Sequence, residues 1–149
     1  MLRIQSIGIA SDHAGYYLKQ KLKLYLETKG YNLRDFGSHS PESSDYPDFA
    51  HSLASAVEKG KFDVGITLCG SGNGISMTAN KHEGIRSAIC WDPEVAELAK
   101  THNNANICAL PARFVDYDQA VEIVETFLNA QFEGGGRHER RIEKIPIKK

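Results

Sequence analysis

Short apolar segments rich in β-branched residues alternate along this chain with longer segments of helical periodicity, and this alternation limits its fold more than any other feature. Strand-like segments are expected at residues 4–10, 31–36, 63–68, 85–90 and 107–110. The segments between them repeat apolar residues every three or four positions, as in Leu18, Leu22 and Leu26. The pattern predicts an α/β fold with a parallel sheet of about five strands, helices on both faces and right-handed crossovers.

Several helix boundaries are marked by residues with known capping preferences. Pro47 and Pro93 suit the first turn of the second and fourth helices, and Asp92 and Asp116 are placed to cap the fourth and fifth. A further helical stretch is expected over residues 75–82. Triple glycine at residues 134–136 ends the last long helix and begins a basic segment, residues 134–149.

Composition narrows the functional classes. A net charge of −1 gives no overall preference for nucleic acid or for a membrane surface, and no apolar stretch is long enough to span a bilayer. Three cysteines without the spacing of metal ligands are typical of free thiols in a reducing cytosol. We therefore expect one cytoplasmic domain over residues 1–149 that binds neither nucleic acid nor membrane.

A cysteine followed by three glycines is the strongest functional signal. Cys69 comes at the end of the third strand, where ligands of parallel α/β sheets collect. Gly70, Gly72 and Gly74 allow the backbone to approach a ligand and to direct several N–H groups at one anion. The alternative is a buried thiol before an ordinary turn. Three glycines in five residues exceed what a turn needs, which favours function.

The other two cysteines give a different signal. Cys90 and Cys108 lie within strand-like runs, where a buried structural thiol is the default.

Other polar clusters are candidates to join this loop at one edge of the sheet. Asp12 and His13 follow the first strand, Arg113 follows the fifth, and His102 with Asn103 closes the fourth helix. Each has an ordinary alternative, since Asp12 could cap a helix and His102 could respond to a helix dipole. Their expected convergence at the same edge favours a binding site.

Two arginines of the C-terminal segment are further candidates. Arg137 and Arg141 are four residues apart, which on a helix places both guanidinium groups on one side, where they suit a phosphate. The alternative is a solvated tail.

Three familiar kinds of site do not fit the glycine loop. Ile75 stands where a dinucleotide-binding loop needs its last glycine, and no Gly-Lys-Ser/Thr follows as in a Walker loop. No zinc-type pairing of cysteine and histidine is present either. The remaining possibilities are covalent thiol chemistry and proton transfer with the thiolate as base, neither of which needs a metal or an organic cofactor.

The glycine loop and its flanks resemble the signature of type B ribose-5-phosphate isomerases, a family shared with allose- and galactose-6-phosphate isomerases. The signature segments are Leu68-Cys69-Gly70-Ser71-Gly72-Asn73-Gly74-Ile75-Ser76, Ala79-Asn80-Lys81 and Gly84-Ile85-Arg86. Other family blocks follow in order from about residue 4 to about residue 142: Ser11-Asp12-His13-Ala14-Gly15, Asp45-Tyr46-Pro47-Asp48, His102-Asn103 and Gly135-Gly136-Arg137-His138. The resemblance implies a three-layer, Rossmann-like domain and a homodimer, or a tetramer, with the active site across the subunit interface.

Carried over by position, the resemblance implies a role for each site residue. Cys69 would move a proton between C2 and C1 of the open sugar, Ser71 would assist proton movement on the hydroxyls, and Asp12 and His102 would serve ring opening. Substrate binding is implied for His13, Tyr46, Gly70, Gly72, Asn73, Gly74, Asn103, Arg113, Arg137 and Arg141. The chain has Ser71 where many members have threonine, and Ile75-Ser76 where some relatives have a glutamate base, which favours the cysteine-base subtype.

The expected activity is therefore the interconversion of D-ribose 5-phosphate and D-ribulose 5-phosphate, a step of the pentose phosphate pathway, without metal or cofactor. Isomerisation of allose 6-phosphate or galactose 6-phosphate is the alternative substrate choice. A flavodoxin-like phosphate-binding module without turnover, and a cysteine nucleophile that forms a covalent adduct, are the alternatives from other classes.

Overall fold

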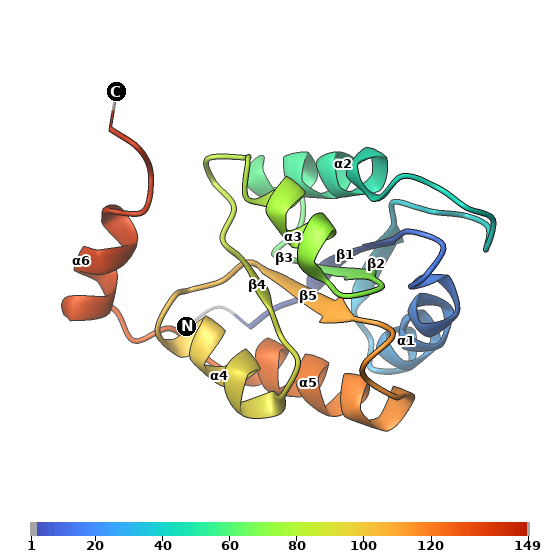
Figure 1. Cartoon of the computed structure of the whole chain (residues 1–149). Helices are drawn as coiled ribbons and strands as arrows, with labels where there is room; N and C mark the ends of the chain where they lie inside the picture. Colours follow the sequence, from blue (N-terminus) through green and yellow to red (C-terminus); the bar gives the residue numbers. More distant parts are fainter. Residues whose placement is uncertain (1–2, 149) are drawn as a thin grey trace.

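The computed structural model describes residues 3–148, and its five strands form one parallel sheet (Figure 1). The strands are β1 (Ser6–Ser11), β2 (Asn32–Asp35), β3 (Val64–Cys69), β4 (Ser87–Ile89) and β5 (Ile107–Pro111), in the order β2-β1-β3-β5-β4. The helices are α1 (Tyr16–Thr28), α2 (Tyr46–Glu58), α3 (Asn73–Ala79), α4 (Pro93–Thr101), α5 (Tyr117–Asn129) and α6 (Arg137–Glu143). The predicted α/β class with a parallel sheet is confirmed.

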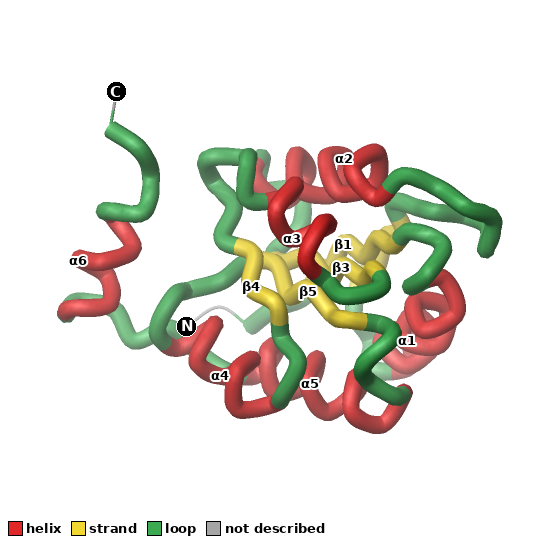
Figure 2. The backbone as a smooth tube through the Cα atoms, in the orientation of Figure 1, coloured by secondary structure: helices red, strands yellow, loops and turns green. Residues whose placement is uncertain are grey.

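Helices cover both faces of the sheet (Figure 2). Helices α2 and α3 pack on one face, and α1, α4 and α5 pack on the other. Leu22 and Leu26 of α1 are fully buried against the second group, as the helical periodicity predicts, whereas Leu18 is only half-buried. Burial of such leucines contributes about 2 kcal/mol each to folding. The outcome is a three-layer arrangement.

Two boundaries near the glycine loop differ from the sequence-based expectation. Strand β3 extends to Cys69, and α3 covers residues 73–79 instead of 75–82. Gly72 takes a left-handed conformation with φ of 82° at the N-cap, and the Ser71 hydroxyl accepts a hydrogen bond from the Asn73 N–H at 3.2 Å. The chain therefore turns in three residues, and Gly74 lies within the first turn of the helix.

The predicted caps of the later helices are confirmed. The Asp92 carboxylate accepts a hydrogen bond from the Glu94 N–H at 2.9 Å. Asp116 and Gln119 form a reciprocal capping box at the start of α5, with bonds of 2.8 and 2.9 Å. Such caps contribute about 1 kcal/mol each.

Helix α6 stands apart from the rest of the molecule, at the end opposite to α1 (Figure 1). It contains the two arginines that the sequence places four residues apart, and none of its residues is buried. Within residues 3–148, no helix combines the length and apolar character needed to cross a bilayer.

Candidate active site

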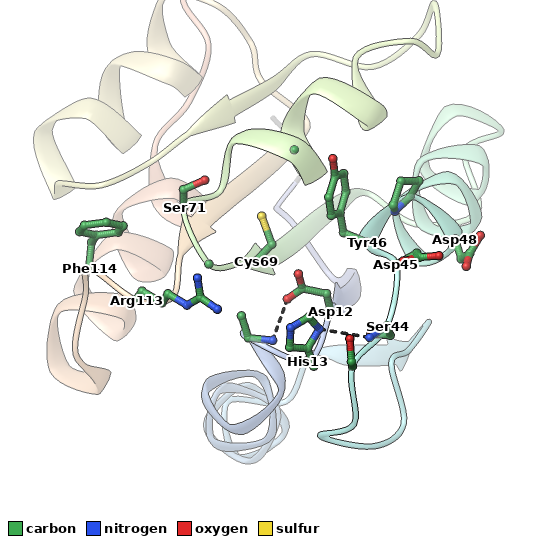
Figure 3. A pocket seen from close by; sticks show the side chains of 15 residues that line it. Asp12, His13, Ser44, Asp45, Tyr46, Asp48, Cys69, Ser71, Arg113 and Phe114 are labelled. Carbon is green, nitrogen blue, oxygen red and sulfur yellow. Dashed lines mark hydrogen bonds between the residues drawn. The ribbon is translucent and has the colours of Figure 1, made fainter.

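A cavity of about 960 Å³ opens at the carboxyl ends of β1 and β3 (Figure 3). The sheet order reverses direction at these two strands, because β2 lies on one side of β1 and β3 lies on the other. Ligands of open α/β sheets bind at such switch points. The cavity is lined by Asp12, His13, Ala14, Ser43, Ser44, Asp45, Tyr46, Pro47, Asp48, Cys69, Gly70, Ser71, Gly74, Arg113 and Phe114.

Cys69 is the cysteine that reaches the cavity. It is the last residue of β3, its exposed fraction is 4 %, and it packs against Ala50, Ile75 and Ala109. Apolar side chains therefore pack against one side of the thiol, and its other side faces the cavity (Figure 3). An enclosed thiol of this kind can meet a ligand without being surrounded by bulk water.

The other two cysteines are confirmed as buried, free thiols. Cys90 and Cys108 are fully buried, and neither lines the cavity. A hydrogen bond with Cys90, together with burial, raises the pKa of the Cys108 thiol well above its usual value. A thiol with a raised pKa is a poor nucleophile and a poor base at neutral pH.

Unpaired backbone N–H groups follow Cys69. Within residues 3–148, the N–H groups of Gly70, Ser71 and Gly72 make no backbone or side-chain hydrogen bond. The carbonyl groups of Cys69 and Gly70, by contrast, accept bonds from the N–H groups of Ala112 and Arg113, at 2.9 and 3.0 Å. The loop is thereby fixed by its acceptors while its donors stay available to an anion.

Arg113 lies directly on this loop. A Cβ atom added at Gly70 would come within 3.1 Å of the Arg113 guanidinium, so that a side chain at position 70 would push the arginine aside. Glycine at this position therefore keeps a positive charge beside the backbone donors.

Asp12 holds the turn after β1 and also lines the cavity. Its Oδ1 atom accepts hydrogen bonds from the N–H groups of Ala14 and Gly15, at 2.9 and 3.2 Å, and so holds the turn before α1. The N-cap of α1 is Gly15 without a side-chain cap, so Asp12 is not the helix cap considered for it. The residue is 6 % exposed and points toward Cys69 (Figure 3). Because both bonds use Oδ1, the second carboxylate oxygen is left for a ligand.

Tyr46 narrows the cavity from the opposite side. A Cβ atom added at Gly74 would overlap the Tyr46 ring, and Tyr46 lies across the cavity from Arg113 in Figure 3. Gly74 therefore serves here to admit the tyrosine at the start of α3.

Four predicted site residues lie away from this cavity, and for two of them, His102 and Asn103, the expected convergence with the strand-end clusters is wrong within a single chain. His102 and Asn103 end α4, and Arg137 and Arg141 lie on α6. A helix between parallel strands runs back toward their amino ends, which carries the end of α4 away from the cavity.

His102, Arg137 and Arg141 instead lie around His138, and these four residues are called the basic cluster below. The rings of His102 and His138 stack with centroids 4.0 Å apart. Partial burial, together with the charges of His102, Arg137 and Arg141, lowers the pKa of His138.

The remaining predicted residues lie at or beside the cavity. Gly72 and Asn73 belong to the glycine loop but do not line the cavity. The cavity also contains residues that sequence reasoning passed over, namely Ser44, Asp45 and Phe114. The turn-forming composition of residues 38–45 indicates a loop, but it does not indicate that this loop folds toward the cavity. Within the described residues, no group of three or more metal-ligating side chains comes together.

The exposure of the three thiols predicts their order of reaction. Iodoacetamide added to the native protein is expected to alkylate Cys69 first, because Cys69 alone of the three lines the cavity. Peptide mapping by mass spectrometry measures the order. Alkylation of Cys90 or Cys108 at the same rate would show that Cys69 is not the accessible thiol.

Known proteins resemble this chain over nearly its whole length. The family model described as Ribose/Galactose Isomerase matches residues 7–145. Ribose-5-phosphate isomerase B of Escherichia coli is 42 % identical over 142 residues, covering 95 % of both chains. D-erythrulose-4-phosphate isomerase of Pectobacterium atrosepticum is 44 % identical over 142 residues, covering 94 % of this chain and 92 % of the relative.

A solved structure extends the likeness to three dimensions. Ribose-5-phosphate isomerase B from Mycoplasma genitalium, determined with bound ribulose 5-phosphate, superimposes with a TM-score of 0.91 at 44 % identity. The match covers 97 % of this chain and 95 % of that one. With a family match over nearly the whole length and a shared Rossmann-like fold, the chain belongs to the ribose/galactose isomerase family.

Proposed function

We propose that this chain is an aldose–ketose isomerase that interconverts D-ribose 5-phosphate and D-ribulose 5-phosphate, with Cys69 as the general base. One observation carries the proposal: a thiol opens into a polar cavity directly beside unpaired backbone N–H groups and an arginine. The family match and the Mycoplasma genitalium relative with bound ribulose 5-phosphate support this choice of substrate.

The chemistry is a proton transfer between neighbouring carbons. The Cys69 thiolate removes the C2 proton of the open aldose, the C2–H electron pair forms the enediolate double bond, and negative charge develops on the carbonyl oxygen. The thiol then returns a proton to C1, and a hydroxyl proton moves from O2 to O1 with help from Ser71. Fixed N–H donors aimed at a developing oxyanion can contribute about 3 kcal/mol each to lowering such a barrier.

The loop N–H groups are the candidates to hold that oxyanion. The N–H groups of Gly70, Ser71 and Gly72 are unpaired within residues 3–148, and Gly74 follows them at the helix start. Asn73 is tied to the Ser71 hydroxyl and supports the turn. Asp12, with one free carboxylate oxygen, is positioned for ring opening.

The phosphate end of the sugar requires cations and donors away from Cys69. His13 lines the cavity on the β1 side, and Arg113 lines it beside the glycine loop, so that together they supply a ring donor and a guanidinium group for a phosphate. Phosphate binding at a distance from the reacting carbons orients the sugar and supplies binding energy for the chemical step. Tyr46 bounds the space between the two ends.

A second copy of the chain completes the site in this proposal. His102, Asn103, Arg137 and Arg141 lie away from their own cavity, and α6 buries none of its residues. Large apolar side chains are exposed around edge strand β4, with Met77 on α3 at 67 % and Trp91, after β4, at 62 %. A homodimer that covers this edge would bring the basic cluster of one protomer to the cavity of its partner.

The remaining proposals concern organisation and substrate length. We take residues 1–149 as one isomerase domain of the cytoplasm, in keeping with its three free thiols.

The family description includes galactose as well as ribose, and the Pectobacterium atrosepticum relative is named for a four-carbon substrate. The ratios of kcat/KM for erythrose 4-phosphate, ribose 5-phosphate and allose 6-phosphate distinguish these substrates.

Substitution of the proposed base tests the mechanism. Cys69→Ala is expected to lower kcat at least ~100-fold, because it removes the general base, while inorganic phosphate still binds. Steady-state kinetics measure the loss. Cys90→Ala is the matched control, since it removes a buried thiol outside the cavity and should leave kcat unchanged. Near-normal turnover by the Cys69 variant would refute the assignment.

Substitution on α6 tests the shared site. Arg137→Ala is expected to raise KM about tenfold or more, because its charge-assisted bonds to phosphate are made in both the ground and the transition state. Arg140→Ala, on the same helix, should leave KM unchanged. An unchanged KM for the Arg137 variant would remove it from the site.

Mixing these two impaired variants tests whether the site crosses the interface. Co-refolded Cys69→Ala and Arg137→Ala chains should regain about a quarter of wild-type activity at low substrate, because half of the dimers are mixed and each mixed dimer has one intact site. No regain on mixing, or an active monomer by light scattering, would contradict the shared site.

A further inference from the structure

Lys19 is a charged side chain with no exposed surface, and it is bonded to the end of β2 and to the loop that follows it. Its Nζ atom donates to Asp35 Oδ1 at 2.8 Å and to the Ser38 carbonyl oxygen at 2.6 Å. Lys23 reaches the other oxygen of Asp35 at 3.0 Å and is one-quarter exposed. Lys19 therefore joins α1 both to the end of β2 and to the loop after it.

A buried ion pair of this kind costs free energy to enclose. Burial lowers the pKa of Lys19, and Asp35 offsets only part of that effect. Burial also acts to raise the pKa of Asp35, but hydrogen bonds from Lys19, the Gly37 N–H and Lys23 outweigh it and lower the pKa. An apolar residue would fill the same position in α1 without a desolvation penalty, so stability alone does not explain a lysine here.

The Ser38 carbonyl that Lys19 holds belongs to a segment paired with the first cavity strand. Ser11 donates its N–H to the Gly37 carbonyl at 2.7 Å, and its own carbonyl accepts from the Ser38 N–H at 2.6 Å. Ser11 directly precedes Asp12 and His13. The position of Ser38 therefore fixes the start of the 37–44 loop relative to the Asp12–His13 turn.

The far end of that loop contacts His13. The Ser44 N–H donates to Nδ1 of His13 at 3.2 Å (Figure 3). A ring nitrogen that accepts a hydrogen bond carries no proton, so neutral His13 keeps its proton on Nε2. His13 can then offer an Nε2–H donor to an anion in the cavity.

We propose that Lys19 is a positioning residue for phosphate recognition: by holding Ser38 it keeps the 37–44 loop where the Ser44 N–H fixes His13 as the Nε2–H tautomer. This rests on the proposed function in one respect, that the phosphate of the substrate is the ligand of His13. The Lys19–Asp35 pair makes no contact with substrate and acts only through the loop.

Lys19→Met and Lys23→Met form a matched pair for the test. Each substitution removes one lysine that donates to the Asp35 carboxylate, but only Lys19→Met also removes the donor to the Ser38 carbonyl. Lys19→Met is expected to raise KM for ribose 5-phosphate about fivefold, because a mixed tautomer population weakens the hydrogen bond from His13 to the phosphate without abolishing it, with kcat within about twofold. Lys23→Met should leave both constants unchanged.

Lys19→Met leaves a buried carboxylate with one partner fewer and can fail to fold. In that case Lys19→Met/Asp35→Asn replaces it, because the double variant removes the unpaired charge while Ser38 still lacks its donor. The same rise in KM is expected.

A spectroscopic reading separates positioning from general destabilisation. Nitrogen-15 NMR of the imidazole groups, with the His13 signals assigned from His13→Asn, should show an unprotonated Nδ1 in the wild type and in Lys23→Met. In the folded Lys19 variant, the chemical shifts of the two His13 nitrogens should move toward the values of a mixed tautomer population.

Two results overturn the proposal: unchanged KM and His13 signals in a folded Lys19 variant, or the same rise in KM in Lys23→Met. If the wild-type protein isomerises no sugar phosphate, the proposed function fails, yet the His13 signals and their titration with inorganic phosphate still decide the role of Lys19.

Discussion

The parallel pairing of β1 with β3 is the constraint on which the rest of the molecule depends. Ser11 is in register with Leu68, and the Asp12 N–H donates to the Leu68 carbonyl at 3.2 Å, so that the turn after β1 begins beside Cys69. The contact is close because Gly15 has no side chain: a Cβ atom there would lie 2.6 Å from the Cβ of Leu68. Strand pairing thus places the carboxylate of one turn next to the thiol of the other.

This pairing also separates two kinds of chemistry within a small space. On the β3 side, Cys69 has an apolar back and adjoins unpaired N–H groups, which suits a base beside a developing oxyanion. On the β1 side, His13 is held by a loop that a buried ion pair fixes in place. In the proposed reaction, the rigid strand would carry the reacting group, and the loops would carry the groups that recognise the remainder of the ligand.

Much of the fold could be predicted from the sequence, because local patterns determine it. Strand and helix types, the caps at Asp92 and Asp116, and the burial of Leu22 follow from periodicity and capping preferences. Strand order could not be predicted, since it depends on which helix faces pack together. The two-residue error at the start of α3 arose because a glycine at the N-cap shortens the turn.

The candidate site was predictable where its residues lie at the carboxyl ends of strands, as Asp12 and Cys69 do. It was not predictable for His102, whose helix carries it away from the cavity. Lys19 was overlooked because lysine usually lies at the surface. The only signal was its position on the buried stripe of α1, three residues before Leu22.

The central claim is that a proton leaves carbon, resides on a cysteine side chain and returns to the neighbouring carbon. Isomerisation of ribose 5-phosphate in deuterium oxide tests it most directly, because a thiol exchanges its proton with solvent. The account predicts carbon-bound deuterium at C1 of the ribulose 5-phosphate formed, detected by NMR or mass spectrometry. Rapid turnover that leaves no carbon-bound deuterium in the product would contradict the account.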